Sequence, residues 1–319
     1  MTILPAYQDL PIDPKYPPKT AWGIWGEDDN LGTLNLLTEE RVLKATQNVK
    51  KGKVFPLNWD LEKPNPPLFG RTVIDHHIRD RGNDAKKFDD VYDNFNTQTS
   101  SQWDGLRHVC HHKSNRFYNN ISADHILPGP NASDRLGIHH MARRGIAGRA
   151  VLLDYGRWRS ARDSNYNPLV REEVPVEDLE QVAKEQGVTF QEGDILLVRY
   201  GWMEAYEKSG GALPSENLAR PDSVGIEASE KTFEWIWNHH FACVGGDVFA
   251  FEAFPVKDWD LSCHAQFLGG FGMPIGEMFY LEKLAEECAQ DGVYEFLFTS
   301  APLNKYKGVA TPPNAICIK

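Results

Sequence analysis

Short apolar runs alternate with amphipathic segments along most of the chain. Residues 150–154 and 194–200 are compact apolar runs, which predict buried strands. Between them, residues 175–187 open with proline, carry acidic residues in the first turn and end with glycine, which predicts a helix. This alternation predicts an α/β fold built from mixed sheets and helices.

The same patterns predict further elements on both sides of this unit. Thr38 is a helix cap followed by apolar residues at helical spacing. Further helices are expected at residues 229–240 and 278–289, and further strands at 53–58, 72–78, 243–247 and 294–300. The acidic residues 84–96 predict a surface loop. Residues 1–19 are rich in proline and lack periodicity, so we expect an extended arm over the body or a neighbouring subunit, followed by one domain at 20–319.

Composition narrows the class of protein. The 319 residues are 41% hydrophobic and 25% charged, as in globular proteins. The net charge of −11 argues against nucleic acid and anionic membrane surfaces as partners, and favours a small molecule. No apolar run approaches the roughly 20 residues of a membrane helix. The five cysteines lack CxxC spacing, so we expect free thiols and a cytoplasmic protein.

One polar stretch offers candidate metal ligands. Gln98, Gln102, Asp104 and His108 lie in one short segment, in two pairs that are each four residues apart. If the segment is helical, the members of each pair share a face, and their oxygen and nitrogen atoms can hold a divalent metal. The alternative interpretation is a capped turn on the surface.

A second candidate set joins His264 to Glu277 across a glycine-rich turn. The two side chains can converge from a short helix and the start of the next one, although a single histidine in an apolar segment is often a hydrogen-bonded core residue. Cys263 adjoins His264 but lacks the context of a nucleophile. Motifs of serine hydrolases, P-loop NTPases and dinucleotide-binding proteins are missing from the sequence.

These residues resemble a known family. Residues 101–108, SQWDGLRH, are similar to the H-x-G-T-H-x-D-x-P-x-H signature of cyclase-like, kynurenine formamidase-type metal-dependent hydrolases. Asp104 matches the metal-binding Asp and His108 the last His, whereas Gln98 and Gln102 stand where the family has two metal-binding His. Residues 148–154, 191–202 and the pair His264 and Glu277 resemble three further family motifs in the same order.

The resemblance implies a swivelling β/β/α fold, a homodimer or homotetramer, and hydrolysis of an amide or a lactone with zinc or manganese. Gln98, Gln102 and Asp104 are the metal ligands that it implies, and His108, His264 and Glu277 are the catalytic residues. Because amide and carboxylate oxygens suit manganese better than zinc, manganese is favoured, and loss of the metal stays open.

Three functions remain open from the sequence. The first is a metal-dependent hydrolase in which a metal-activated water attacks the substrate and His108 is the general base. The second is a metal-independent cyclase, dehydratase or isomerase, and the third is a non-catalytic binder. Trp25, Trp103 and Trp202 are candidates to contact an apolar or aromatic ligand, although tryptophans are also common in cores.

Overall fold

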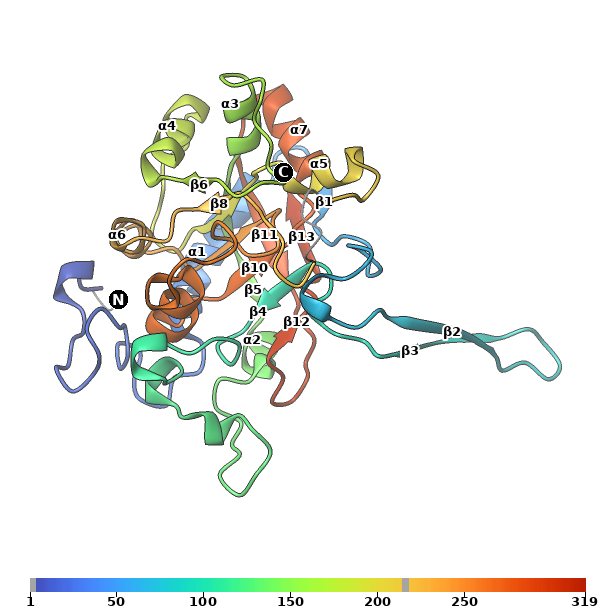
Figure 1. Cartoon of the computed structure of the whole chain (residues 1–319), viewed down its shortest axis with the longest axis horizontal. Coiled ribbons are helices and arrows are strands. Elements are labelled where there is room, and N and C mark those ends of the chain that lie inside the picture. The colour runs from blue at the N-terminus through green and yellow to red at the C-terminus, as the bar shows by residue number, and fades with distance from the viewer. Residues whose placement is uncertain (1–3, 214–217) are drawn as a thin grey trace.

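The computed structural model describes residues 4–213 and 218–319, and its centre is a nine-stranded mixed sheet (Figure 1). Four adjacent strands are parallel: β5 (Ile146–Leu153), β7 (Ile195–Val198), β9 (Cys243–Gly246) and β10 (Ile275–Glu277). Antiparallel strands flank this block on both sides. Beyond β5 lie β11 (Glu295–Ser300), β13 (Ala315–Ile318) and β1 (Val54–Pro56); beyond β10 lie β4 (Gln102–Asp104) and β12 (Ala310–Thr311).

Helices connect the parallel strands, as parallel pairing requires. Between β5 and β7 lie α3 (Tyr155–Ser160) and α4 (Val176–Gln186); between β7 and β9 lie α5 (Trp202–Lys208) and α6 (Glu230–Asn238); between β9 and β10 lies the π-helical segment Ala265–Phe271. The other α-helices are α1 (Glu39–Ala45), α2 (Ile138–Arg144) and α7 (Glu282–Asp291). In the described ranges, none of the helices has the length and apolar character needed to span a bilayer.

Both faces of the central sheet are covered. On β7, Leu196 and Val198 belong to the apolar core that includes α4 and α6, whereas Ile195 and Leu197 belong to the core that includes α2 and α7. All four side chains are fully buried. A strand covered on both faces carries an unbroken apolar run rather than an alternating one, which explains why the sequence predicts it well.

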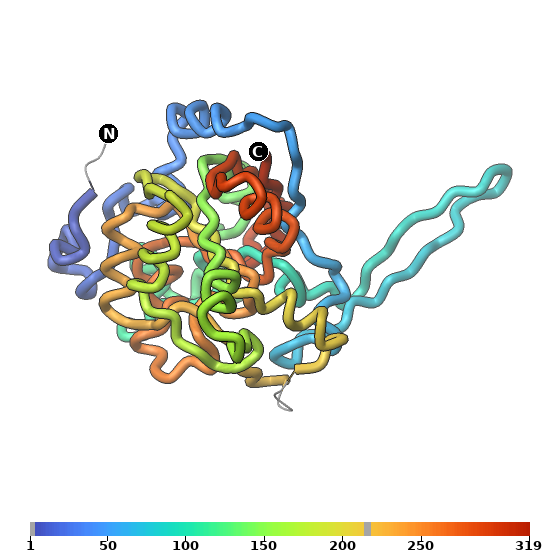
Figure 2. The backbone as a smooth tube through the Cα atoms, turned by 90° about the horizontal axis from the view of Figure 1, so that it is seen from above, coloured from blue at the N-terminus to red at the C-terminus, as the bar shows by residue number. Residues whose placement is uncertain are grey.

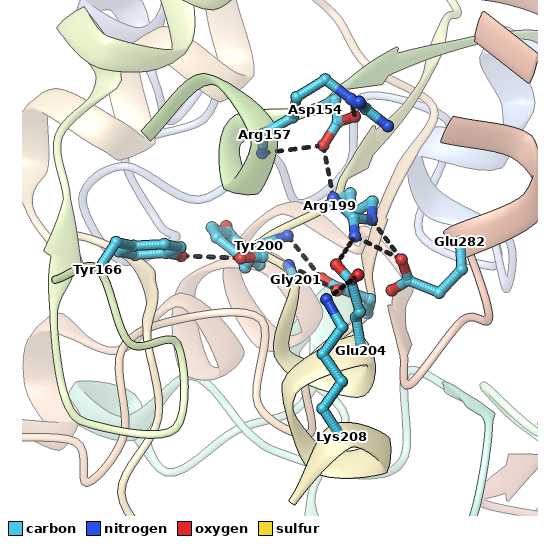
Figure 3. A network of polar contacts seen from close by, with 10 residues as sticks. Asp154, Arg157, Tyr166, Arg199, Tyr200, Gly201, Glu204, Lys208 and Glu282 are labelled. Carbon is cyan, nitrogen blue, oxygen red and sulfur yellow. Dashed lines mark hydrogen bonds and ion pairs between the residues drawn. The ribbon is translucent and has the colours of Figure 1, made fainter. Parts of the chain in front are cut away.

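A buried ion-pair network joins the ends of β5 and β7 (Figure 3). Asp154 follows β5, and one of its oxygens lies 2.9 Å from Nη1 of Arg199, which follows β7. Arg199 also pairs with Glu204 of α5 and Glu282 of α7. Asp247, at the end of β9, accepts hydrogen bonds from the backbone N–H groups of the two residues after Arg199. The polar residues that end these predicted strands therefore connect the strands to the helices around them.

A two-stranded hairpin projects far from the body of the molecule (Figures 1 and 2). It consists of β2 (Asp75–Asp80) and β3 (Phe88–Asp93), which pair antiparallel over their whole length. The prediction of a loop at 84–96 was therefore wrong, because this acidic segment forms β3 through pairing with β2. A second small sheet pairs β6 (Glu173–Val174) with β8 (Gly225–Ile226) in parallel.

The beginning of the described chain packs on its own body. Tyr7 is almost fully buried, and its backbone N–H donates to Asn238 at the end of α6. Pro5 and Tyr7 thus lie against α6, and Lys19 contacts Gln266 of the π-helical segment, while residues 1–3 of the expected arm lie outside the described residues. The five cysteines are free thiols, as expected. The helix predicted at 278–289 begins later, because its first residues follow β10 in a non-helical turn and α7 begins at Glu282.

Candidate active site

The candidate site lies where three elements meet at one end of the sheet. Strand β4 contributes Asp104 and the adjoining His108, strand β10 ends at Glu277, and His264 precedes the π-helical segment. The segment around Asp104 is a strand rather than the helix considered from its spacing, because β4 pairs with both β10 and β12. Glu277 likewise lies on a strand, not at the start of a helix. The two sets of candidates nevertheless converge.

His264 is at the centre of the cluster. Its Nε2 atom lies 3.5 Å from Oδ2 of Asp104 and 3.0 Å from Oε1 of Glu277. Nε2 of His108 lies 3.6 Å from the same oxygen of Asp104. Asp104 is fully buried and Glu277 nearly so, whereas the side chain of His108 is 27% exposed. His108 therefore connects the buried carboxylates to the surface.

Glu252 fixes the orientation of His264. It is fully buried, and its carboxylate lies 2.9 Å from Nδ1 of His264 and accepts a hydrogen bond from the backbone N–H of the same residue. Because Nδ1 is used in this way, Nε2 faces Asp104 and Glu277. Histidines that bind a metal commonly donate the N–H of their other ring nitrogen to a carboxylate in this way.

The two glutamines point their amide N–H groups at the carboxylates. Nε2 of Gln98 donates to Oδ1 of Asp104 at 2.9 Å, and Nε2 of Gln102 donates to Oε2 of Glu277 at 2.5 Å. Gln102 also reaches Oδ1 of Asp104 at 3.3 Å. Both glutamines thus lie in the cluster and hold the carboxylates in place. The other oxygen of each carboxylate, Oδ2 of Asp104 and Oε1 of Glu277, is buried, faces the imidazoles and accepts no hydrogen bond from any other described residue.

Burial and charge shift the pKa values of the cluster in different directions. Burial opposes ionisation of Asp104, but His108 and His264 hold its pKa below 3.8. Burial and the charge of Asp104 raise the pKa of Glu277 to about 7. Burial lowers the pKa of His108 below 6.5, which keeps its imidazole neutral at neutral pH. Burial alone would lower the pKa of His264 as well, yet Glu252 and the other carboxylates raise it well above 6.5.

This donor set fits a divalent cation. Ligand atoms of Asp104, His108 and His264 all lie within 4.8 Å of one another. Oδ2 of Asp104 and Oε1 of Glu277 both lie beside Nε2 of His264, so a cation there would compensate negative charges whose burial is otherwise costly. Carboxylate oxygens with one or two imidazole nitrogens form a mixed set that accepts manganese or zinc.

A second cluster of Asp134, His139 and His140 fits a cation less well. Nδ1 of His139 accepts a hydrogen bond from the backbone N–H of Lys307, which assigns the proton of the neutral ring to Nε2. That Nε2 atom faces Asp134 at 3.9 Å and would have to lose its proton to bind a metal. We therefore assign the chemistry to the first cluster.

The three tryptophans lie elsewhere. Trp103 lies between Gln102 and Asp104 on β4, so its side chain points to the opposite face of the sheet. There it packs edge-on against Phe279 and is fully buried. Trp202 stacks on Tyr206 in α5, and Trp25 packs edge-on against Trp237. The structure records no contact of these three side chains with the carboxylates or imidazoles of the cluster.

Two residues of the site, Glu252 and Arg71, are not predicted from the sequence. Glu252 is the single charged residue among the apolar residues 248–256, and such isolation was a usable signal for a buried partner. Arg71 lies just before β2 and donates from Nη1 to Oε1 of Gln102 at 3.3 Å and to the backbone oxygen of Gln98. No sequence motif includes Arg71, because the residues of the projecting hairpin separate Arg71 from Gln98 along the chain.

Carboxylates and histidines that converge on a mixed α/β sheet are typical of enzymes with a metal-binding active site. Comparison with known families is more specific. Residues 36–253 match the model of the Cyclase family, described as "Putative cyclase". The chain therefore belongs to the Cyclase family, as the resemblance of its motifs predicted. A search of curated proteins found no match.

Solved structures agree with this assignment. A structure described as a novel cyclase is 29% identical, with a TM-score of 0.82 over 94% of this chain and 99% of that chain. Isatin hydrolase A from Labrenzia aggregata, bound to benzyl benzoate, is 16% identical, with a TM-score of 0.58 over 83% and 93% of the two chains. Isatin hydrolase A from Ralstonia solanacearum is also 16% identical, with a TM-score of 0.58 over 88% and 98%. The predicted cyclase-like α/β fold is confirmed.

Proposed function

We propose that the protein is a metal-dependent hydrolase that opens a cyclic amide, a lactone or a related amide or ester of a small apolar or aromatic molecule. The observation that carries this proposal is the convergence of Asp104, His264 and Glu277, with two buried carboxylate oxygens that face Nε2 of His264. The similarity in fold to isatin hydrolases, whose name denotes action on a cyclic amide, supports the class of reaction.

Asp104, His264 and Glu277 would hold the ion, and Gln98 and Gln102 would keep the carboxylates in position. We favour manganese over zinc because carboxylate oxygens outnumber imidazole nitrogens in this set. When bound, such an ion lowers the pKa of a water molecule and polarises the substrate carbonyl. The free thiols of the five cysteines fit the cytoplasmic location that we propose.

His108 is the residue placed to move protons. It is neutral at neutral pH, partly exposed and beside Asp104, whose charge stabilises the imidazolium once it forms. His108 takes a proton from the attacking water as the new C–O bond forms. It then returns that proton to the leaving nitrogen or oxygen as the C–N or C–O bond breaks.

The test combines metal analysis with assays on isatin and an aromatic lactone. We expect about one manganese or zinc ion per chain in protein purified without chelator, and hydrolysis that a chelator abolishes and added metal restores. His108→Gln should lower kcat about 10²- to 10⁴-fold, the usual contribution of a general base. His125→Gln is the matched control and should retain activity. Protein without metal, or near-wild-type turnover in both His108→Gln and Asp104→Asn, would contradict the proposal.

One observation favours a second function, a metal-independent isomerase or dehydratase. The pKa of Glu277 is raised to about 7, which suits a group that both takes and gives protons at neutral pH. Turnover that survives complete removal of metal, with isomerised or dehydrated product, would favour this alternative.

We also propose that the chain acts as a homodimer or homotetramer. The hairpin of β2 and β3 extends away from its own body, and Ile78, Phe88 and Tyr92 are 66%, 63% and 44% exposed on it. Ile78, Phe88 and Tyr92 lie on one face of the hairpin, because directly paired residues share a face and every second residue along a strand points to the same side. The same face carries His76, Asp80 and Asp90 between these apolar side chains. A two-stranded sheet that exposes apolar side chains is marginal in water, so a second copy is the occupant that we propose for this face.

A further inference from the structure

Arg71 is held rigidly at the glutamine side of the site. Its Nη1 donates to Oε1 of Gln102 and to the backbone oxygen of Gln98. On its other side the guanidinium lies 5.1 Å from the ring centroid of Phe69, which restricts its rotation. The backbone N–H of Arg71 also donates to Leu68. The side-chain contacts hold a permanent positive charge near Asp104 and Glu277, whose charges act on the guanidinium, since a guanidinium keeps its proton in proteins.

The two sides of the cluster differ in which polar atoms already make hydrogen bonds. On the side of Arg71, Gln102 accepts from the guanidinium and donates to Glu277, and Gln98 donates to Asp104. The hydrogen bond from Arg71 fixes the amide of Gln102 with its nitrogen toward the carboxylates. On the side of His264, Oδ2 of Asp104 and Oε1 of Glu277 face the imidazoles and accept no hydrogen bond from any other described residue.

The charges of the cluster balance with one divalent ion. Asp104, Glu252 and Glu277 contribute three negative charges, and Arg71 contributes one positive charge. The sum is −2 when the imidazoles are neutral, as that of His264 is once an ion replaces the proton on its Nε2. One divalent ion brings this sum to zero, whereas a second ion would leave an excess of +2. Uncompensated charge inside a protein is costly, so the residues present match one ion and not two.

We propose that Arg71 takes the place of a second cation in this site. On this inference, which rests on the proposed metal-dependent function, one ion binds between Asp104, His264 and Glu277, and the guanidinium supplies the positive charge on the side of the glutamines. Within residues 4–213 and 218–319, Nε and Nη2 of Arg71 donate to no protein acceptor. These N–H groups are free to bind an oxygen of the substrate.

Manganese titration of the full chain tests the inference by calorimetry, with metal analysis after gel filtration. We expect one ion per chain in the wild type. The double variant Gln98→His, Gln102→His introduces two imidazoles and retains Arg71, so the number of bound ions per chain should stay at one. Adding Arg71→Met to these two changes should raise the count to two. Adding Arg79→Met instead removes an arginine of the hairpin and should leave the count at one.

Each outcome separates the inference from the proposed function. Two ions in the wild type, or in the double variant that retains Arg71, would overturn the inference and leave a metal-dependent hydrolase intact. A single ion in the folded triple variant would also overturn it. Wild-type protein that binds no manganese or zinc would contradict the proposed function itself. Circular dichroism reports whether each variant folds. Where the triple variant does not fold, two ions in the double variant would still overturn the inference.

Discussion

Glu252 illustrates how a residue away from the reacting atoms can control a site. It touches Nδ1 and the backbone N–H of His264, and it leaves Nε2 as the free nitrogen of the ring. A carboxylate that is hydrogen-bonded to the far nitrogen of a metal-binding histidine orients the ring and makes it a stronger ligand. The effect of Glu252 is therefore expected on metal affinity before it appears in catalysis.

Glu252→Gln should weaken binding of manganese about 10- to 100-fold, the usual effect of losing such a partner. The amide keeps the shape of the side chain but removes its negative charge. Calorimetric titration of the chelator-treated protein measures the dissociation constant. Glu227→Gln, outside the cluster, is the control and should bind the ion as the wild type does. Equal affinity in all three proteins would show that His264 needs no partner.

The pH dependence of hydrolysis follows from His108. Burial lowers its pKa below 6.5, so the neutral base form persists at mildly acidic pH. We expect kcat at saturating metal to stay level from pH 8 to about pH 6.5 and to fall only at lower pH, as His108 gains a proton and can no longer accept one. His108→Gln should remove this acidic fall from the residual activity. An acidic limb centred above pH 7 would assign the titration to another group.

At this scale the sequence predicts the site in part. Asp104, His108, His264 and Glu277 are found because they fall in ordered motifs. Trp103 shares a motif with them, yet side chains alternate along a strand and its ring lies in the opposite core. Arg71 and Glu252 reach the site only through tertiary contacts, which no local pattern describes.

At the scale of elements, the polar residues that end the motifs of β5 and β7 connect these strands to the surrounding helices. Asp154 and Arg199 end two strands of the parallel block, and their ion pair is 1% and 6% exposed. Figure 3 shows Arg199 between Asp154 and the glutamates of α5 and α7. Side chains that connect strands to helices stabilise the fold, so motif residues outside the cluster are expected to affect stability first.

Arg199→Met should lower the free energy of unfolding by about 3–5 kcal/mol, because it leaves buried carboxylates without their cation. Arg157→Met is a matched control, since Arg157 pairs with the same Asp154 but is 53% exposed. Its loss should cost at most about 1 kcal/mol. Urea unfolding followed by circular dichroism measures both. Similar losses in the two variants would mean that burial does not determine the strength of these pairs.

The sequence predicts elements with strong local signals better than elements without them. Strands β7 and β9 and helix α4 are predicted close to their observed bounds, because apolar runs and helix-capping residues are local signals, whereas β10 is not predicted and β5 begins four residues before its predicted run. Strand β4 has three residues and exists through pairing with β10 and β12. Strand β3 is acidic and exposed, and only pairing with β2 makes it a strand. Such elements depend on partners that are distant in sequence.

The whole molecule is asymmetric because of the hairpin. Its two strands leave the body beside the site, with Arg71 just before β2 and Gln98 just after β3. A contact that orders the hairpin in an oligomer would therefore also steady both of these residues. Association and activity are expected to change together when the hairpin is altered.

Replacing Ile78, Phe88 and Tyr92 with serine tests the role of the hairpin in association. A stable interface buries roughly 800 Å² on each partner, and apolar side chains supply most of its stability. We expect light scattering coupled to gel filtration to show a dimer or tetramer for the wild type and a smaller species for the variant. The control replaces His77 and Val91, on the opposite face of the hairpin, with serine and should keep the wild-type mass. A monomeric wild type, or a variant of unchanged mass, would show that the apolar face of the hairpin does not join two copies of this chain.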